Sequence, residues 1–351
     1  MSTATAHRRI VPRVLLVVLF LLASLSAGGA SAKPPKGEPP PRGKLDMFGD
    51  IGDFVPGVVD DPVHDPTLFE HRGTYYVFST GILDPEDPGG IFARRSRGTL
   101  EGPWESMGAI PLPEWTRQYN VNHLWAPHVV ERRGVFYLYY SASSFGVNRS
   151  AIGVARTRTP GDLDSWEDLG PILTSDPSVD YNAIDPMVFE ARGQWWIAFG
   201  SFWDGIKLQR LRNMTEPYGP IHSLARRRPD VQFNPIENSQ IFRKGRYWYL
   251  LTSWDFCCRG TDSTYRIAVG RSRSVTGPYV DADGVPLTEG GGTVILSSRG
   301  NQIGPGAPDV LWEFGRYYMV HHYYDANADG VIRMQIREIE WRDGWPWFPP
   351  D

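Results

Sequence analysis

Residues 73–76 read Gly-Thr-Tyr-Tyr, a glycine followed after one residue by two aromatic side chains. The same arrangement returns as Gly-Val-Phe-Tyr at 134–137, Gly-Gln-Trp-Trp at 193–196, Gly-Arg-Tyr-Trp at 245–248 and Gly-Arg-Tyr-Tyr at 315–318. The five glycines are 61, 59, 52 and 70 residues apart. Five copies at this spacing predict a chain built from five similar structural units.

The residues around each glycine predict β-strands. Aromatic and β-branched residues alternate after the glycines, as in 74–80, 135–141 and 194–200, and further short runs follow in each unit. No stretch carries the 3.6-residue apolar stripe of a convincing helix. Units longer than 50 residues with three or four strands each are typical of propeller blades. We therefore predict an all-β fold, a five-bladed β-propeller whose paired rings pack between neighbouring blades.

Acidic residues recur at one position of this repeat. Eight residues before the glycines stand, in order, Asp65, Ala126, Asp185, Glu237 and Ala307. Proline follows at four of these five places, which supports the alignment independently. The innermost strand of each blade lines the channel of a propeller, so we expect the three acids to face one another.

Three acids at one structural position predict catalysis, whereas a single Asp-Pro pair is usually a turn. Like charges in a poorly solvated site cannot all ionise freely, so their pKa values are forced apart. Glycoside hydrolysis needs such a pair, one protonated carboxyl group and one carboxylate. We assign the longer Glu237 as the proton donor and Asp65 as the base. Asp185 is expected to hold Glu237 in place and to raise its pKa.

The N-terminus predicts export. Basic residues precede an unbroken apolar run at 14–23, and Ala30-Ser31-Ala32 suits a signal peptidase, so residues 1–32 are predicted to be a signal peptide and the protein to be secreted. Ten apolar residues are too few to span a bilayer, which needs about 20. Residues 33–46 are a proline-rich linker, and 47–351 are left to form the catalytic propeller. The net charge of −4 argues against a nucleic-acid partner.

The only two cysteines are adjacent, Cys257 and Cys258. Two cysteines provide no disulfide framework, so stability must come from packing. A vicinal disulfide and a pair of small side chains in a turn both remain open. Zinc is not favoured, because no second ligand pair follows at the required spacing, and we predict no metal-ligating residues.

A family resemblance rests on seven stretches: Val63-His-Asp-Pro-Thr67, Leu124-Trp-Ala-Pro127, Ala183-Ile-Asp-Pro186, Phe199-Gly-Ser-Phe-Trp203, Ile236-Glu237, Phe256-Cys-Cys-Arg-Gly-Thr-Asp-Ser-Thr-Tyr265 and Gly304-Pro-Gly306. In these, from about residue 60 to 340, the chain resembles glycoside hydrolase family 43, most closely its endo-1,5-α-L-arabinanases. The resemblance implies a five-bladed propeller, net inversion, and the three roles given above to Asp65, Asp185 and Glu237.

The resemblance also implies a substrate cleft across one face of the propeller. The residues that it places beside the sugar or in the walls of the cleft are Trp125, Phe145, Asn182, Ser201, Phe202 and Trp203. Aromatic faces suit the apolar side of a furanose ring. The alternative for each is a packing role, since aromatic residues make up 13% of the chain.

Three departures from the family bear on cofactors and preference. Family members usually carry a histidine after Gly304-Pro-Gly306 that helps to hold a cation such as calcium in the channel, but Ala307 stands here. His321 or His322 is the alternative source of an imidazole, and a structural role is the other reading of both. His128 replaces an aspartate after Trp-Ala-Pro, and Asn238-Ser239 replaces Ala-Pro or Gly-Pro after Ile-Glu, changes that bear on substrate preference. We expect no cofactor to be required for the chemistry.

We therefore predict a secreted, inverting endo-hydrolase of α-1,5-L-arabinofuranosidic bonds, whose partner is arabinan or a related plant cell-wall polysaccharide. No membrane contact is expected after signal cleavage, and the protein is expected to be a monomer. One alternative is an exo-acting α-L-arabinofuranosidase or β-xylosidase of the same family. The other is a sugar-binding propeller without catalysis, which leaves the aligned acids unexplained.

Overall fold

The structure is a computed structural model that describes residues 62–81, 90–119, 121, 123–231 and 233–349. The predicted signal peptide (1–32) and linker (33–46) lie outside these residues, so both stay predictions. Within the described part of the chain, no helix has the length and apolar character needed to cross a membrane.

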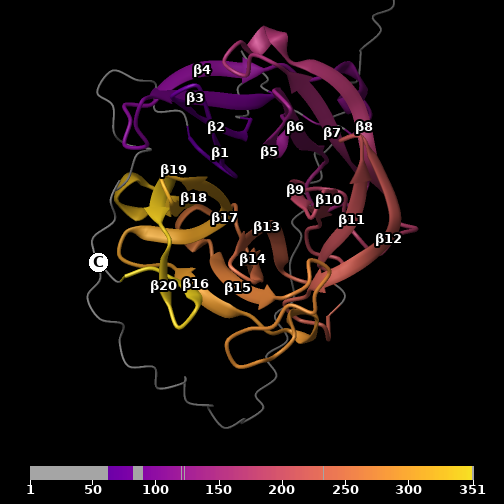
Figure 1. Ribbon diagram of the computed structural model, residues 1–351, viewed down its shortest axis with the longest axis vertical. Coiled ribbons are helices and arrows are strands. Elements are labelled where there is room, and N and C mark those ends of the chain that lie inside the picture. Colours follow the sequence, from indigo (N-terminus) through magenta and orange to yellow (C-terminus); the bar gives the residue numbers. More distant parts are fainter. Residues whose placement is uncertain (1–61, 82–89, 120, 122, 232, 350–351) are drawn as a thin grey trace, which may run out of the picture. The chain divides into compact units, whose positions relative to one another are not determined.

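Five antiparallel sheets follow one another along the chain and surround a common centre (Figure 1). The first contains β1 (Thr67–His71), β2 (Thr74–Thr80), β3 (Ile91–Arg97) and β4 (Glu105–Ile110). The second contains β5 (Trp125–Arg132), β6 (Val135–Ala142), β7 (Ser150–Thr157) and β8 (Glu167–Ser175), and the third β9 (Met187–Ala191), β10 (Gln194–Phe199), β11 (Ile206–Arg212) and β12 (Glu216–Ala225). The fourth contains β13 (Ile236–Lys244), β14 (Tyr247–Trp254), β15 (Arg266–Ser272) and β16 (Thr293–Ser297), and the fifth β17 (Gln302–Glu313), β18 (Arg316–Asp325) and β19 (Val331–Glu338).

The remaining elements are short. A hairpin of β20 (Glu340–Arg342) and β21 (Trp345–Trp347) follows the fifth sheet, and the helical segments are 3₁₀ turns: η1 (Glu114–Tyr119), η2 (Leu163–Ser165), η3 (Gly260–Asp262), η4 (Leu287–Glu289) and η5 (Ala326–Ala328). The innermost strands β1, β5, β9, β13 and β17 contact one another in a closed circle. The predicted five-bladed β-propeller is confirmed.

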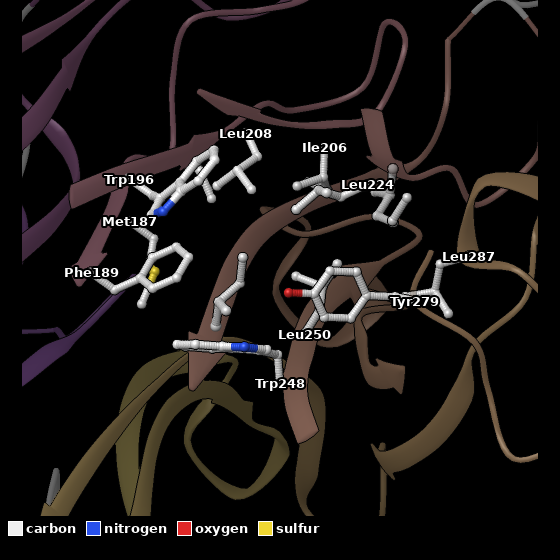
Figure 2. Packing of buried hydrophobic residues seen from close by; sticks show 14 of the residues in the cluster. Met187, Phe189, Trp196, Ile206, Leu208, Leu224, Trp248, Leu250, Tyr279 and Leu287 are labelled. Carbon is white, nitrogen blue, oxygen red and sulfur yellow. The ribbon is translucent and has the colours of Figure 1, made fainter. Parts of the chain in front are cut away.

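Five hydrophobic clusters fill the spaces between neighbouring sheets, one for each pair. Figure 2 shows the cluster between the third and fourth sheets, where the Phe189 and Trp248 rings lie 5.7 Å apart. Each large apolar side chain buried here contributes about 1.5–3 kcal/mol. Tyr75 packs toward the fifth sheet and Tyr76 toward the second, because successive side chains of a strand point to opposite faces. The prediction that the paired rings pack between blades is therefore confirmed.

The repeated glycine occupies a hairpin turn, and its place in that turn corrects the alignment of the acids. In four blades the glycine is the second turn residue and follows a residue of positive φ, as in Arg72-Gly73 with φ 53° and 76°. In the fourth blade Gly245 is the first turn residue and Arg246 the second. Counting back from the turn, Asn238 rather than Glu237 is therefore equivalent to Asp65 and Asp185.

Candidate active site

A cavity of about 30 Å³ lies at the centre of the propeller and is lined by residues of all five sheets. Its lining includes the five equivalent residues that precede the innermost strands or lie within them, Asp65, Ala126, Asp185, Asn238 and Ala307. All five have positive φ, between 43° and 56°. A space of this size holds water but not a sugar ring.

Hydrogen bonds between neighbouring blades hold these five residues in their unusual backbone conformation. The second strand of one blade supplies a side chain that accepts the N–H of the equivalent residue in the next blade. The four pairs are Thr80 Oγ1 with Ala126 (2.9 Å), Ser141 Oγ with Asp185 (2.9 Å), Ser253 Oγ with Ala307 (2.8 Å) and His322 Nδ1 with Asp65 (3.2 Å). The backbone of Asp65 and that of Asp185 are thus each held by a side chain of the preceding blade.

The third blade has a glycine, Gly200, where the others carry this acceptor side chain. The N–H of Asn238 donates instead to Asp185 Oδ2 at 3.2 Å. A Cβ atom on Gly200 would lie 2.4 Å from the carbonyl oxygen of Gly205, and its φ is 124°, so only glycine suits this position. Because Gly200 has no side chain, the Asp185 carboxylate takes this place as acceptor and contacts β13, the strand that carries Glu237.

The Asp65 carboxylate is held in its ionised form. Its Oδ2 lies 2.8 Å from His64 Nδ1 and accepts the Thr80 hydroxyl at 2.6 Å. Burial alone would raise the pKa of Asp65, but the charge and hydrogen bond of His64, with smaller contributions from His322 and Thr80, together outweigh burial and lower this pKa to about 2. Burial alone would lower the pKa of His64, but its interactions with Asp65 and Tyr324 together outweigh burial and raise this pKa to about 10.

Asp185 and Glu237 form a second, differently balanced pair. Burial raises the pKa of both, and the charge of Asp65 raises both further. Glu237 reaches a pKa of about 7 although Ser201 donates a hydrogen bond to it, and Tyr265 donates to its other oxygen. The charge of Glu237 also raises the pKa of Asp185. The pair therefore retains a proton under conditions in which Asp65 has lost its own.

Two of the predicted substrate-binding residues, Ser201 and Phe202, contact Glu237 or the residue before it, and Trp203 follows them in the chain. Ser201 is buried and its hydroxyl donates to Glu237 Oε2. Phe202 and Trp203 follow with φ 52° and 32°, and the Phe202 N–H donates to the carbonyl of Ile236 at 3.0 Å. Strained conformations of bulky residues persist where the surroundings enforce them, and such residues cluster at functional sites.

The other three predicted binding residues differ in exposure. Asn182 is buried, and its Oδ1 accepts a hydrogen bond from the Ser150 hydroxyl at 2.6 Å, a contact within the protein. Phe145 is 81% exposed, and its ring lies 6.5 Å from that of Trp125 at a steep angle. An aromatic pair with one ring in solvent suits stacking on a sugar, so Trp125 and Phe145 stay predicted walls of a binding cleft.

Four residues around the acids were not predicted from the sequence. His64 and Thr80 contact Asp65, Tyr265 contacts Glu237, and Tyr324 contacts His64. His322 was considered only as an imidazole for a cation, whereas it accepts the Asp65 N–H. Seven residues after the second turn position stand Thr80, Ser141, Gly200, Ser253 and His322, so the repeat did contain a signal for part of this set. Tyr265 and Tyr324 obey no repeat, and only the folded chain brings them to the site.

The carboxylate of Asp309 deep in the channel has no capacity left for a cation. Its Oδ2 accepts Thr67 Oγ1 and the Leu68 N–H, both at 2.8 Å. Its Oδ1 accepts Gln240 Nε2 at 2.6 Å and the Val310 N–H at 2.7 Å. Four hydrogen bonds use all the lone pairs of a carboxylate.

Neither candidate histidine replaces the one that is missing at Ala307. His322 Nδ1 accepts the Asp65 N–H, so a neutral ring carries its proton on Nε2 and has no free lone pair for a metal. Burial, followed by the charge of Arg337, lowers the pKa of His321 to about 3, and that same charge repels a cation. Among the described residues, these groups do not fit the cation that the resemblance implies.

Five sheets surround a channel, and acids from three of them gather beside it, an arrangement suited to the hydrolysis of glycosidic bonds. The sequence pattern of glycosyl hydrolases family 43 matches residues 58–346, and the chain belongs to this family. It is a glycoside hydrolase.

Known relatives cover most of the chain. An extracellular endo-α-(1→5)-L-arabinanase of Bacillus subtilis is 38% identical over 297 residues, which are 83% of this chain and 89% of the relative. An extracellular exo-α-(1→5)-L-arabinofuranosidase of Cellvibrio japonicus is 38% identical over 303 residues, 81% of this chain and 85% of the relative. A solved α-L-arabinanase of Cellvibrio cellulosa, in complex with arabinohexaose, is 37% identical with a TM-score of 0.74 and covers 82% of this chain and 95% of its own.

Proposed function

We propose that the protein is a secreted hydrolase that cleaves internal α-1,5-L-arabinofuranosidic bonds of arabinan with net inversion. Support for the substrate comes from two relatives whose names carry the α-(1→5) linkage of L-arabinose, and from the similar α-L-arabinanase that was solved with arabinohexaose. Support for export comes from the N-terminal sequence and from the word extracellular in the names of two relatives.

In this proposal Asp65 is the general base and Glu237 the general acid. Asp65 accepts a proton from the attacking water while Glu237 delivers one to the departing glycosidic oxygen. Asp185 hydrogen-bonds the backbone beside Glu237, and the repulsion between the two buried groups keeps a proton in the pair. The products carry one new hydroxyl each, and the enzyme ends with the proton moved from Glu237 to Asp65.

The single observation that carries the proposal is the unequal surroundings of the acids: His64 and Thr80 contact Asp65, whereas Glu237 is buried beside two hydroxyl groups. The pKa of Asp65 is lowered to about 2 and that of Glu237 is raised to about 7. Between pH 2 and pH 7, Asp65 can accept a proton and Glu237 can supply one. A purely structural cluster has no need of this asymmetry, which disfavours the sugar-binding propeller without catalysis.

The principal test separates acid from base by the leaving group. E237Q should lower kcat on arabinan by about 10²–10⁴-fold, but much less on an arabino-oligosaccharide with a nitrophenolate leaving group, which departs without protonation. D65N should lose both activities, and E114Q, at a carboxylate that is 78% exposed, should lose neither. Equal losses of E237Q on both substrates, with an unchanged melting temperature, would remove Glu237 from the acid role.

An exo-acting arabinofuranosidase is the second candidate, because the exo-acting relative is as similar to this chain as the endo-acting one. Product sizing over time on linear arabinan, branched arabinan and xylan separates the two. Early oligosaccharides of mixed length support internal cleavage, whereas a single short product from the start supports the exo reading. Release of xylose would favour a β-xylosidase.

We also propose that the protein acts as a monomer without a required cation or a nucleic-acid partner. The hydrogen-bond saturation of Asp309 and the Nδ1 contact of His322 support the absence of a cation requirement. Sedimentation at several concentrations checks the oligomeric state.

A further inference from the structure

The loop after β14 carries a disulfide between the adjacent residues Cys257 and Cys258. Of the two alternatives for these cysteines, a vicinal disulfide or a pair of small side chains in a turn, the structure has the disulfide. The bond lies next to the active site, since Cys258 Sγ is 3.8 Å from His64 Nε2. The mechanism proposed above makes no use of it.

A continuous chain of contacts leads from this disulfide to the proposed base. The Cys258 N–H donates to the Tyr324 hydroxyl oxygen at 2.7 Å, and that oxygen lies 2.9 Å from His64 Nε2. The opposite nitrogen of the same ring, Nδ1, lies 2.8 Å from Asp65 Oδ2. Tyr324 therefore links the disulfide loop to one side of the His64 ring, and Asp65 occupies the other side.

The disulfide has a direct physical effect on the first contact of this chain. Joining adjacent residues closes a small ring around one peptide group and restricts the direction of the Cys258 N–H. Cys258 also has φ 64°, a left-handed conformation that side chains with a Cβ atom disfavour. Without the cross-link, Cys258 has no covalent reason to keep this conformation, and its N–H is free to turn away from Tyr324.

We propose that the Cys257–Cys258 disulfide positions the proposed base Asp65 through Tyr324 and His64, so that reduction of this bond weakens catalysis. Cys258, Tyr324 and His64 are positioning residues, since none of them is assigned a contact with substrate. The inference rests on the proposed function only in taking Asp65 as the base.

The electrostatic surroundings give this chain a measurable consequence. The titratable groups that face Asp65 or His64 come from several blades: His123, Asp185, Glu237, His322 and Tyr324. His322 stacks on His64 with ring centroids 3.9 Å apart and stays neutral, because burial lowers its pKa. A His64 ring that loses its Tyr324 contact should hold Asp65 less well, and burial then raises the pKa of the carboxylate.

The first experiment is reduction of the intact protein with dithiothreitol, which supplies two electrons and two protons and leaves as its cyclic disulfide. Thiol titration should count two new thiols. We expect kcat/KM on arabinan to fall about tenfold with little change in melting temperature, and its acidic limb to move up by about one pH unit. The C257S/C258S variant should show the same loss and no response to dithiothreitol. Full activity and an unchanged pH profile after two thiols appear would overturn the proposal.

Y324F supplies the second test, because it removes the hydroxyl and leaves the disulfide intact. Y324F should reproduce the pH shift, and adding C257S/C258S to it should cost little more, since both changes break one chain of contacts. Fully additive losses would contradict the proposal. If reduction lowers the melting temperature strongly, the lost activity could come from unfolding, and the pH profile of Y324F alone then tests the proposal.

A third measurement separates this inference from the proposed function. The His64 ring, assigned with H64Q, can be titrated by NMR in the oxidised and reduced protein without any substrate. A titration midpoint that falls on reduction supports the chain of contacts even if arabinan is not cleaved, in which case the proposed function fails alone. An unchanged midpoint refutes the inference whatever the activity.

Discussion

His64→Gln is the perturbation that tests the active-site electrostatics most directly. The lowering of the Asp65 pKa from 3.8 to about 2 corresponds to about 2.5 kcal/mol in favour of the ionised carboxylate. His64 supplies the two largest favourable contributions, its charge and its hydrogen bond, against the opposing effect of burial. A glutamine keeps a hydrogen-bond donor near Asp65 but removes the charge.

Without that charge, burial raises the Asp65 pKa to its ordinary value of 3.8 or above. The base is then protonated in a range where the wild-type base is ionised, so the acidic limb of kcat/KM should rise by about two pH units. The assay is initial rates on linear arabinan from pH 3 to pH 8, with the melting temperature measured at each pH. Activity near pH 7 should fall much less than activity at pH 4.

The matched control is His222→Gln, a half-buried histidine on the outer strand β12 whose ring lies 6.1 Å from that of Trp196. It should leave the pH profile unchanged. A folded H64Q variant whose acidic limb stays near pH 2, as in the wild type, would refute the reasoning, because another group would then be keeping Asp65 ionised.

Three further predictions concern stability, packing and ions. The folded-state pKa of His321 is lowered from 6.5 to about 3, so its neutral form contributes stability above pH 6.5 that is lost as the pH falls toward 3. In denaturant titrations, the free energy of unfolding of H321N should fall by about 2 kcal/mol less than that of the wild type between pH 6.5 and pH 5. Equal falls would contradict this. A Cβ atom on Gly306 would lie 2.1 Å from the Tyr265 ring, so G306A should lower the free energy of unfolding by about 1–3 kcal/mol. It should also lower kcat, because the Tyr265 hydroxyl would move away from Glu237. An unchanged kcat would count against that contact. Dialysis against a chelator should leave kcat and the melting temperature unchanged, since Asp309 is saturated with hydrogen bonds; a loss that added calcium restores would reverse this prediction.

The repeat explains why the fold could be predicted from the sequence. The spacing of Gly73, Gly134, Gly193 and Gly315 reflects hairpin turns that need left-handed backbone, a local requirement that is visible without any tertiary contact. The alternation after each glycine reflects the two faces of a strand, and both faces are buried between blades. Local chemistry and global packing agree in these segments.

The alignment of the fourth unit failed for a local reason that the sequence concealed. Gly245 occupies the first rather than the second place of its turn, so counting eight residues back reaches Glu237 instead of Asn238. A shift of one residue in a strand reverses the direction of every side chain. Glu237 therefore reaches the cluster from the neighbouring position, where Ser201 and Tyr265 hydrogen-bond it.

The sequence by itself determined the number of blades, the strand pattern and the equivalent places of Asp65 and Asp185, because these follow from periodicity and from hydrophobic alternation. Only the tertiary structure decided how the acids differ. Asp65 is ionised because His64 lies against it, and His322 holds its backbone from the last blade. The pKa of Glu237 is raised because burial and the charge of Asp65 outweigh the Ser201 hydrogen bond and the charge of His64. Protonation depends on distances between residues that are up to 260 positions apart, and no local pattern encodes such distances.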